Sequence, residues 1–302
     1  MTLAIIGAGK WGRALQTAFL DVDAEASIVS RSPCDAPNLT TIDEALKSPL
    51  LVMAISVQAT SGWLKERFIF NGQKILVASK GIDTQSGKFL NEIYSQHAPI
   101  ENIAFLCGPG FAAEVTRKLP TALTIASTSE ESAAAFMRRF PSWIKTYRIS
   151  DIIGAEIAGA YKNVIAIAAG VCDALGLGAN ARAALITRGL AEMTRFGLFF
   201  GAKLETFLGL AGVGDLALTA TSELSRNYRV GFALGRKRSL QEILDELGEV
   251  AEGVPTARAI ATLSKKNNLH TPIANEVTKL FDGGDALIGV TSLMIRANEK
   301  EF

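Results

Sequence analysis

The amino-acid sequence predicts an α/β fold, a doubly wound parallel sheet of the Rossmann type, followed by an all-α C-terminal domain. Short apolar runs alternate with helical stretches up to about residue 147, as in folds that cover a parallel sheet with helices on both faces. The first apolar run leads directly into a glycine-rich loop, and from residue 152 onward alanine-rich segments of helical period replace the strands. We therefore expect a Rossmann-type domain over residues 1–147 and an all-helical domain over residues 148–302.

The individual elements are predicted from the length and periodicity of the apolar runs. Strands are expected at residues 3–6, 26–30, 50–56, 74–79, 103–107 and 121–126, with helices between them at 13–20, 42–47, 87–96 and 130–140. In the second half, helices are expected at residues 154–175, 181–199, 228–235, 240–247, 254–267, 273–281 and 287–296. Ligands of a doubly wound sheet bind at the carboxyl ends of its strands, so the loops that follow the strands are candidate sites.

The composition is that of an ordinary globular protein and argues against several classes of partner. The 31 basic and 30 acidic residues nearly cancel, whereas proteins that bind nucleic acid or anionic membranes carry a basic excess. The three cysteines, Cys34, Cys107 and Cys172, form no paired motif, which argues against a zinc site or a disulfide scaffold. With only His97 and His270 in the chain, a histidine-based metal site is not expected either.

The sequence contains no pattern typical of secretion or of membrane insertion. It begins with a strand pattern rather than with the basic and apolar regions of a signal peptide. No uninterrupted apolar run approaches the roughly 20 residues that span a bilayer. Together with the unpaired cysteines, these features lead us to expect a cytoplasmic protein without a membrane-inserted segment.

The loop at residues 7–12, with the letters GAGKWG, matches the dinucleotide-binding fingerprint in spacing and in position. In that fingerprint Gly7 allows a tight turn, Gly9 lets a pyrophosphate approach the backbone, and Gly12 lets the helix pack closely on the strand. The N–H groups at the start of the helix then face the phosphates. The simpler alternative is a glycine-rich turn without a ligand. The fingerprint thus assigns Gly7, Gly9 and Gly12 to cofactor binding.

The end of the second predicted strand indicates which nicotinamide cofactor is used. An acidic residue at this point binds the ribose 2′-hydroxyl of NAD, whereas an arginine accommodates the 2′-phosphate of NADP. Here the strand ends in Ser30, Arg31 and Ser32, without a carboxylate at its tip. Arg31 would pair with a phosphate in bidentate fashion. We therefore expect NADP, with NAD also accepted; the alternative is that Arg31 is an ordinary surface residue.

Lys162 is the best candidate for acid–base chemistry. It is the one cation within an otherwise small and apolar helical segment, and desolvation favours the neutral amine that accepts a proton. The alternative is a lysine whose ammonium reaches solvent along the helix. Asn163 beside it offers a hydrogen bond at the same helix edge. His97 and His270 follow no predicted strand, so we interpret both as structural.

Further polar clusters are typical of anion sites. Lys80 follows a predicted strand, and residues 108–114 after the next strand form a glycine-rich turn with free backbone N–H groups. Asp215 lies at a predicted helix start, where it is either a functional carboxylate or only an N-cap. Arg226 and Asn227 precede another helix, in a position that suits a phosphate.

Taken together, these segments resemble the bacterial type of NAD(P)-dependent sn-glycerol-3-phosphate dehydrogenases over nearly the whole chain. Beyond the loop at residues 7–12, the matching segments are 79–81 (SKG), 108–114 (GPGFAAE), 162–166 (KNVIA), 214–219 (GDLALT), 225–227 (SRN) and 250–253 (VAEG). The resemblance implies interconversion of sn-glycerol 3-phosphate and dihydroxyacetone phosphate with NAD(P)(H). It also implies a role in supplying glycerol 3-phosphate for phospholipid synthesis, and a homodimer.

The resemblance also implies roles for individual residues. Lys162 would exchange the proton of the substrate's C2 oxygen, and Asp215 would orient that lysine and balance its charge. The residues implied to bind the substrate are Lys80, Gly108, Gly110, Asn163, Thr219, Ser225, Arg226 and Asn227, the last two at its phosphate. The residues implied to bind the cofactor, besides Gly7, Gly9 and Gly12, are Lys10, Trp11, Arg31, Lys80, Ala112, Arg226, Val250 and Glu252.

Two segments depart from the family pattern. Gly110 stands where the family usually has a serine, so a hydroxyl contact to the substrate is missing. The segment at residues 32–38 is short where the family commonly carries a longer helical insert. Two other functions stay open at this point: a related dehydrogenase of a β-hydroxyacid or sugar acid, and an NAD(P)-binding module without catalysis.

Overall fold

The computed structural model describes residues 2–248 and 251–294. Contacts divide the chain into two compact units, one formed by Met1–Gly159 with Gly197–Asp215 and the other by Ala160–Phe196 with Leu216–Phe302. The chain thus leaves the first unit, returns to it and leaves it again. The domain boundary after residue 147 stays a prediction, although the last strand does end at Ile149 and the described elements after it are all helical.

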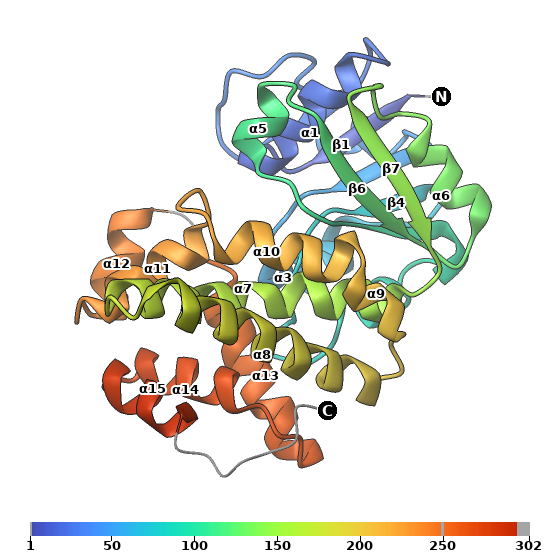
Figure 1. Cartoon of the computed structure of the whole chain (residues 1–302). Helices are drawn as coiled ribbons and strands as arrows, with labels where there is room; N and C mark the ends of the chain where they lie inside the picture. Colours follow the sequence, from blue (N-terminus) through green and yellow to red (C-terminus); the bar gives the residue numbers. More distant parts are fainter. Residues whose placement is uncertain (1, 249–250, 295–302) are drawn as a thin grey trace. The chain divides into compact units, whose positions relative to one another are not determined.

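A seven-stranded sheet forms the centre of the first unit (Figure 1). Its strands are β1 (Leu3–Ile6), β2 (Ser27–Val29), β3 (Leu50–Met53), β4 (Lys74–Val77), β5 (Ile103–Cys107), β6 (Thr121–Ala126) and β7 (Ile144–Ile149). They lie in the order β2-β1-β3-β4-β5-β6-β7. Every neighbouring pair is parallel except β5 and β6. The predicted Rossmann-type fold class is confirmed, with one antiparallel step in the sheet.

The antiparallel step lies where the connection between strands is short. Between β5 and β6 the chain forms only one helix, α5 (Ala112–Thr116), which packs against α1 (Lys10–Leu20). This connection comprises the 13 residues 108–120, whereas the other consecutive strands of the sheet are joined by 17 to 25 residues. In this shortest connection the chain does not return to the amino ends of the strands, and β6 itself runs back across the sheet.

Helices cover both faces of this sheet. One face packs against α1, α5 and α6 (Glu130–Met137). The other packs against α2 (Ile42–Ala45), α3 (Val57–Arg67), α4 (Leu90–Tyr94), the first turn of α7 (Ile152–Ala174) and the π-helix η2 (Leu210–Gly214). Because both faces are covered, the central strands are apolar on both sides, which is the feature that made them predictable.

The edge strand β7 is absent from the sequence-based prediction for a physical reason. Ile144 is its only fully buried residue, whereas Lys145, Tyr147 and Arg148 are exposed. An edge strand of this kind lacks the apolar run that indicates a central strand. The helices α3 and α9 (Leu204–Leu208) are likewise absent from the prediction, because each buries only a few residues.

The register brings the carboxyl ends of four parallel strands to one edge of the sheet. Ile6 of β1 pairs with Met53 of β3, Met53 with Val77 of β4, and Val77 with Phe105 of β5. The loops that follow these strands therefore meet at one edge, called here the carboxyl edge. This is the edge at which open α/β sheets bind their ligands.

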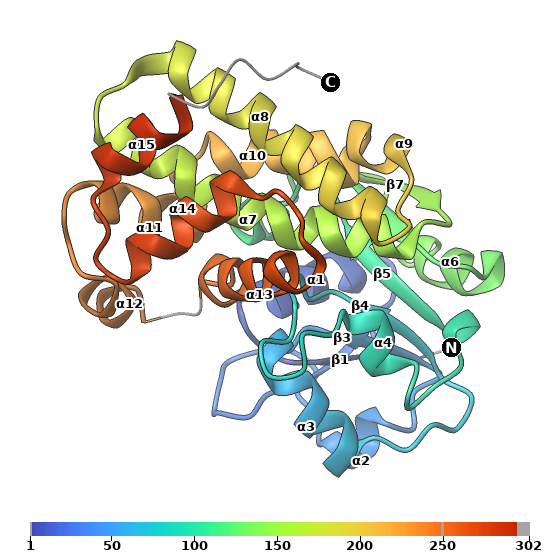
Figure 2. The ribbon, with the colours of Figure 1, turned by 90° about the horizontal axis from the view of Figure 1, so that it is seen from below.

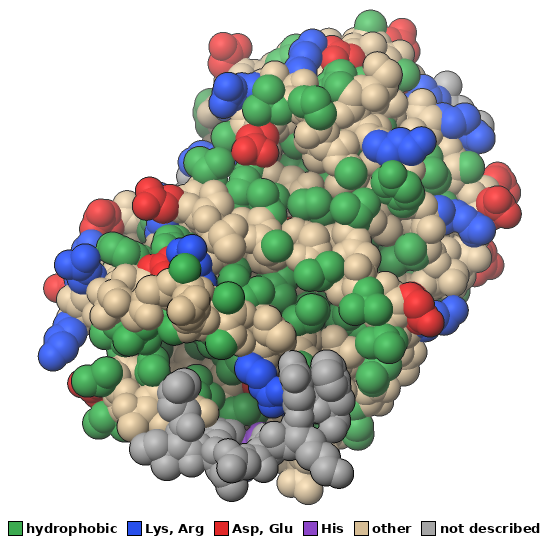
Figure 3. All heavy atoms as spheres, viewed as in Figure 1, with side chains coloured by type: hydrophobic (Ala, Val, Ile, Leu, Met, Phe, Trp, Pro, Cys, Tyr) green, Lys and Arg blue, Asp and Glu red, His purple; other side chains and the backbone are tan. Residues whose placement is uncertain are grey.

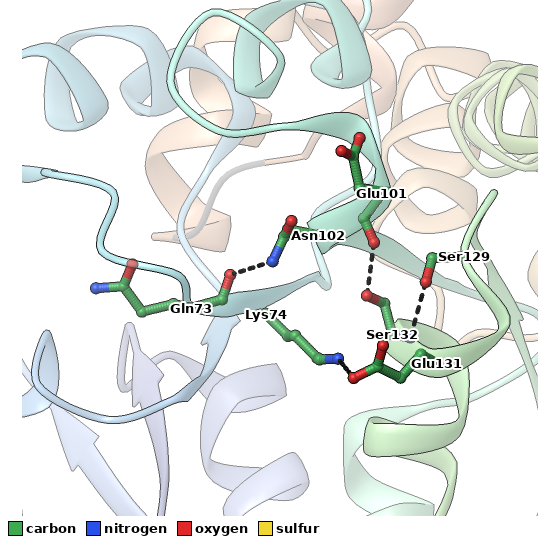
Figure 4. A network of polar contacts seen from close by, with 7 residues as sticks. All are labelled: Gln73, Lys74, Glu101, Asn102, Ser129, Glu131 and Ser132. Atoms are coloured by element: carbon green, nitrogen blue, oxygen red, sulfur yellow. Dashed lines mark hydrogen bonds and ion pairs between the residues drawn. The ribbon is translucent and has the colours of Figure 1, made fainter.

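A separate polar network ties the opposite, amino edge together (Figure 4). The Ser132 hydroxyl of α6 donates to Glu101 O at 2.6 Å, within the 3₁₀ turn η1 (Ile100–Asn102), and Lys74 pairs with Glu131. The Asn102 side chain donates to Gln73 O at 3.3 Å. These contacts fasten α6 and the starts of β4 and β5, so we assign them a structural role.

Helices make up the described part of the second unit (Figure 2). They are α7 after Gly159, α8 (Gly178–Phe199) up to Phe196, α10 (Asp215–Ala220) after Asp215, α11 (Arg226–Gly235), α12 (Leu240–Leu247), α13 (Gly253–Asn267), α14 (Pro272–Phe281) and α15 (Ala286–Met294). All seven helices that periodicity predicts in this half are present, with ends that differ by a few residues. The predicted segment after residue 294 lies outside the described residues.

Close backbone packing and one buried carboxylate hold α7 among its neighbours. A Cβ at Gly231 of α11 would lie 1.8 Å from Ile167 O of α7, so only glycine permits this approach. The Glu192 carboxylate of α8 accepts the Tyr161 hydroxyl of α7 at 2.8 Å and the backbone N–H groups of Ile273 and Ala274 at 2.9 and 3.0 Å. Glu192 thereby joins α7, α8 and the start of α14.

The expectation that no segment is apolar enough to span a membrane is corrected by α7. By length and composition its 23 residues would suffice, and α7 is the one such helix found among the described residues. However, 94% of its most apolar window is buried inside the protein. A core helix meets the same criteria as a membrane span, and the burial of α7 is that of a core helix.

The surface viewed in Figure 3 carries both charge signs interspersed, without a large patch of one sign. Hydrophobic side chains lie among them on the part of this face that carries α9. The exposed large hydrophobic residues between residues 197 and 215 are Leu198, Phe199, Leu204, Leu208 and Val213. The viewed face therefore offers apolar surface rather than a basic groove.

Candidate active site

The glycine loop has the geometry that its sequence predicts. Gly7 has a φ of +111°, and a Cβ there would lie 2.5 Å from Ala54 O. A Cβ at Gly12 would lie 1.9 Å from Gly7 O, so the start of α1 packs directly on the loop. A Cβ at Gly9, by contrast, would meet no atom within 4 Å. The first and third glycines are thus required by packing, and the middle one leaves its side of the loop open.

The start of α1 offers backbone donors at this opening. Gly9 is the N-cap of the helix and provides no side-chain cap, and α1 begins at Lys10, three residues earlier than predicted. The N–H groups of a first helical turn lack partners within the helix and attract anions. Trp11 lies in this turn, and its ring comes 3.4 Å from where a Cβ of Gly110 would be. The residues present therefore fit a bound pyrophosphate.

Arg31 lies just beyond β2, the strand beside β1, with an exposed side chain. The Ser30 hydroxyl donates to Ser32 O at 2.5 Å and folds the chain tightly after the strand. The short segment that follows is tied back by Gln16, which donates to Pro37 O at 2.6 Å. The family's longer insert is thus replaced here by a segment fastened to α1 and β2.

Lys80 is fixed at the carboxyl edge by two hydrogen bonds. It follows β4, and its Nζ donates to Asp215 Oδ2 at 2.7 Å and to Gly108 O at 3.1 Å. The Asp215 side chain is 1% exposed and that of Lys80 19%. The stem of Lys80 passes Gly159 of α7, where a Cβ would lie 3.3 Å from it. This buried, charge-assisted pair positions an ammonium group beside the turn after β5.

Asp215 is not an N-cap, the simpler of its two sequence-based interpretations. It is the first residue of α10 and follows η2 directly, with helical φ and ψ of −71° and −32°. Its carboxylate is therefore available to Lys80 rather than to the helix start. The implied pairing of Asp215 with Lys162 joins residues of the two units and stays a prediction.

The turn after β5 is built from Gly108 to Phe111 and ends at the start of α5. Gly108 has a φ of +97°, which favours glycine. Gly110, in contrast, would accept a Cβ at ordinary contact distances of 3.4 Å from Leu123 and Trp11. Packing therefore does not exclude the family's serine from position 110. Ala112, predicted as a turn residue, is instead the first residue of α5.

In the second unit, Lys162 is 8% exposed on α7, and its Nζ donates to Thr219 Oγ1 of α10 at 3.0 Å. Asn163, beside it, is also buried. The interpretation of Lys162 as a solvent-reaching surface lysine is therefore wrong. A buried amine with a hydroxyl neighbour has the setting that proton exchange requires.

The predicted anion residues gather at the starts of two helices of this unit. Ser225 caps α11, its hydroxyl accepting the Tyr228 N–H at 3.2 Å, and Arg226 is the exposed first residue of that helix. Asn227 Oδ1 accepts the Gly253 N–H at 2.9 Å, beside Glu252 at the N-cap of α13. Asn163 O lies 2.9 Å from where a Cβ of Gly253 would be. Val250 lies outside the described residues.

Glu156 is a buried acid of the first unit to which the sequence patterns assign no role. Its Oε1 accepts the Asn91 N–H at 2.9 Å, whereas its Oε2 is buried without a hydrogen bond. Burial raises the pKa of Glu156 to about 8. The sequence did contain a signal for this buried acid, because Glu156 is a carboxylate within an otherwise apolar helical segment, where burial is expected.

Comparison with known proteins identifies the family. Two family descriptions match the chain, the NAD-dependent glycerol-3-phosphate dehydrogenase N-terminus over residues 32–133 and its C-terminus over residues 151–290. The chain belongs to this family. It is also 54% identical to glycerol-3-phosphate dehydrogenase [NAD(P)+] of Sulfurimonas denitrificans, over 97% of this chain and 98% of that protein.

Two further relatives agree with this assignment. Glycerol-3-phosphate dehydrogenase [NAD(P)+] of Campylobacter jejuni is 55% identical over 97% of this chain and 99% of that protein. The crystal structure of glycerol-3-phosphate dehydrogenase from Coxiella burnetii is similar with a TM-score of 0.90 and 30% identity, covering 98% and 99% of the two chains. The family is one of NAD(P)-dependent enzymes, so the interpretation as a binding module without catalysis is set aside.

Two matched variants test the glycine loop. Gly12→Ala is expected to lower the Tm by about 2–12 °C, because overpacking costs about 1–3 kcal/mol and each kcal/mol lowers Tm by about 2–4 °C in a chain of this size. Gly9→Ala has open space and should change the Tm by no more than about 2 °C. Scanning calorimetry measures both, and equal losses of Tm in the two variants would contradict the geometry.

Proposed function

We propose that this chain reduces dihydroxyacetone phosphate to sn-glycerol 3-phosphate with NAD(P)H and catalyses the reverse oxidation. The observation that carries the proposal is the buried Lys162 amine, bonded to Thr219 in a chain of this family. The bound nicotinamide supplies or accepts the hydride at C2 of the substrate. Lys162 gives a proton to the C2 oxygen during reduction and takes it back during oxidation.

The cations and amides described above are proposed to bind the substrate phosphate and its oxygens. The Lys80 side chain is already held by its hydrogen bonds to Asp215 and Gly108 O, so it needs little further ordering when the substrate binds. Asn227 uses its Oδ1 for the Gly253 N–H, so its amide nitrogen is the end that donates to a phosphate. Arg226 adds a charged donor. The further proposed substrate residues are Gly108, Gly110, Asn163, Thr219 and Ser225.

Cofactor binding is proposed at the glycine loop, with the pyrophosphate at the start of α1. The open side of Gly9 supports this position. Both NAD and NADP are used in the family, and we propose that Arg31 gives this chain a preference for NADP through the 2′-phosphate. The further proposed cofactor residues are Lys10, Trp11, Lys80, Ala112, Arg226, Val250 and Glu252.

The proposed setting is the cytoplasm, where the product would supply glycerophospholipid synthesis. The unpaired cysteines Cys34, Cys107 and Cys172 fit a reducing compartment. We further propose a homodimer that is not inserted in a membrane. The exposed hydrophobic side chains of the segment at residues 197–215 supply apolar surface for such contacts.

The catalytic role of Lys162 is tested by Lys162→Ala. Removing the amine should lower kcat for dihydroxyacetone phosphate by about 10²–10⁴-fold, the usual contribution of a positioned acid or base, with NADPH affinity unchanged. NADPH oxidation and NADPH fluorescence titration measure the two quantities, with Lys203→Ala as the control for an exposed lysine. A variant with more than about a tenth of the wild-type kcat would show that Lys162 is not the acid. If the wild-type protein does not reduce dihydroxyacetone phosphate but reduces a ketoacid, the proposed substrate is wrong.

The cofactor preference is tested by Arg31→Ala. Loss of a charge-assisted contact to the 2′-phosphate should raise KM for NADPH by about 10–100-fold while leaving KM for NADH within about twofold. Steady-state kinetics with each cofactor measure this, and Arg67→Ala serves as the control for an exposed arginine elsewhere in the first unit. Equal changes in KM for NADPH and NADH would show that Arg31 does not contact the 2′-phosphate.

A further inference from the structure

Glu156 is a buried carboxyl group to which the proposed reaction gives no part. It lies on α7 within the first unit and is 7% exposed. Its Oε1 accepts the Asn91 N–H at the start of α4, and the Leu90 N–H also favours its charged form. Its Oε2 has no hydrogen-bond partner among the described residues. A buried carboxylate oxygen without a donor is costly, whereas a protonated one needs only an acceptor.

The charged groups around Glu156 do not compensate a negative charge on it. Glu92 of α4 raises its pKa further, and burial is the largest cause of the shift to about 8. The Lys80 ammonium is already bonded to Asp215 and Gly108 O. The Cys107 thiol of β5, whose pKa burial raises to about 12, stays neutral, and Asp151 and Glu156 are acids that raise the pKa of this thiol further. The neutral acid is therefore the form that this environment favours near pH 7.

A small cavity lies between Glu156 and the turn that carries Lys80. It is lined by Ser79, Lys80 and Gly81 of that turn, Leu90 of α4, Phe105 to Cys107 of β5, and Ala155 and Glu156 of α7. About 10 Å³ is open to the centre of a water molecule, which is room for a single water. Glu156 and the turn at residues 79–81 thus line the same small cavity.

We propose that Glu156, as a neutral carboxylic acid, is a positioning residue for Lys80, acting across the small cavity that both residues line. This inference rests on the proposed function, because Lys80 is taken to bind the substrate. When Glu156 loses its proton, a carboxylate whose Oε2 has no hydrogen-bond partner among the described residues lines this cavity. Such an anion competes with Asp215 for the Lys80 ammonium and favours entry of water. Ionisation of Glu156 should therefore weaken substrate binding more than it slows the chemical step.

The protonation of Glu156 is tested by stability, without reference to activity. Between the unfolded pKa of about 4.5 and the folded pKa of about 8, the folded state holds a proton that the unfolded state has lost. Wild-type Tm should therefore fall relative to Glu156→Gln as pH rises through this window, and the difference should level off above it. A difference in Tm that does not change with pH overturns the proposal.

The positioning role is tested by KM for dihydroxyacetone phosphate from about pH 6 to about pH 9.5. The ratio of wild-type KM to Glu156→Gln KM should be near one at low pH and rise at least about threefold, with a midpoint near pH 8 and a smaller change in kcat. Glu192→Gln, which removes a buried acid of the second unit, should leave the profile unchanged. If the ratio of the two KM values does not depend on pH, or if Glu192→Gln changes the pH profile of KM as Glu156→Gln does, the positioning role of Glu156 is overturned.

Failure of the proposed function and failure of the Glu156 proposal can be distinguished by two measurements. If the wild type does not reduce dihydroxyacetone phosphate, the proposed function fails while the Tm comparison still decides the protonation of Glu156. If Glu156→Gln does not fold, ¹³C-carboxyl NMR of the wild type replaces it, with Glu192→Gln used to assign the second buried glutamate. A glutamate resonance that titrates near pH 8 and persists in Glu192→Gln supports the neutral acid. If every glutamate other than Glu192 titrates below about pH 6, the proposal is overturned.

Discussion

The buried pair of Lys80 and Asp215 is the interaction on which the rest of the site in the first unit depends. It connects the end of β4 with the start of α10, 135 positions apart in the chain. Several local features support it: Gly108 contributes a carbonyl, Gly159 leaves room for the lysine stem, and Asp215 follows η2 as a helical residue whose carboxylate accepts from Lys80. Because a buried carboxylate without its cation is costly, the return of the chain to the first unit at residues 197–215 is part of building this site.

Each unit brings a fixed cation with a distinct partner. In the first unit, Lys80 donates to a carboxylate and to a carbonyl oxygen. In the second unit, Lys162 donates to the Thr219 hydroxyl from a buried position on α7. The first arrangement suits electrostatic binding of an anionic substrate, and the second suits proton exchange. A family of dehydrogenases that act on a phosphorylated three-carbon substrate needs both.

The sequence predicted what local patterns encode and missed what depends on distant contacts. The central strands and long helices were predictable because burial leaves apolar runs of characteristic period, and the close packing at Gly7 and Gly12 followed from the spacing of the glycines. β7 was missed because an edge strand exposes Lys145 and Tyr147, and the antiparallel step was missed because it follows from the short connection between β5 and β6. The Lys80 partner and the orphaned Glu156 oxygen were not predictable, since each depends on residues far away in the chain.

The central claim, that Lys80 and Asp215 act as one buried unit, is tested most directly by a double-mutant cycle on the free energy of unfolding. Lys80→Met, Asp215→Asn and the double variant are compared with the wild type by urea denaturation. The structure predicts a coupling energy of about 1–3 kcal/mol, because each single change leaves the other group without its partner. Losses that add to within about 0.5 kcal/mol would contradict the account.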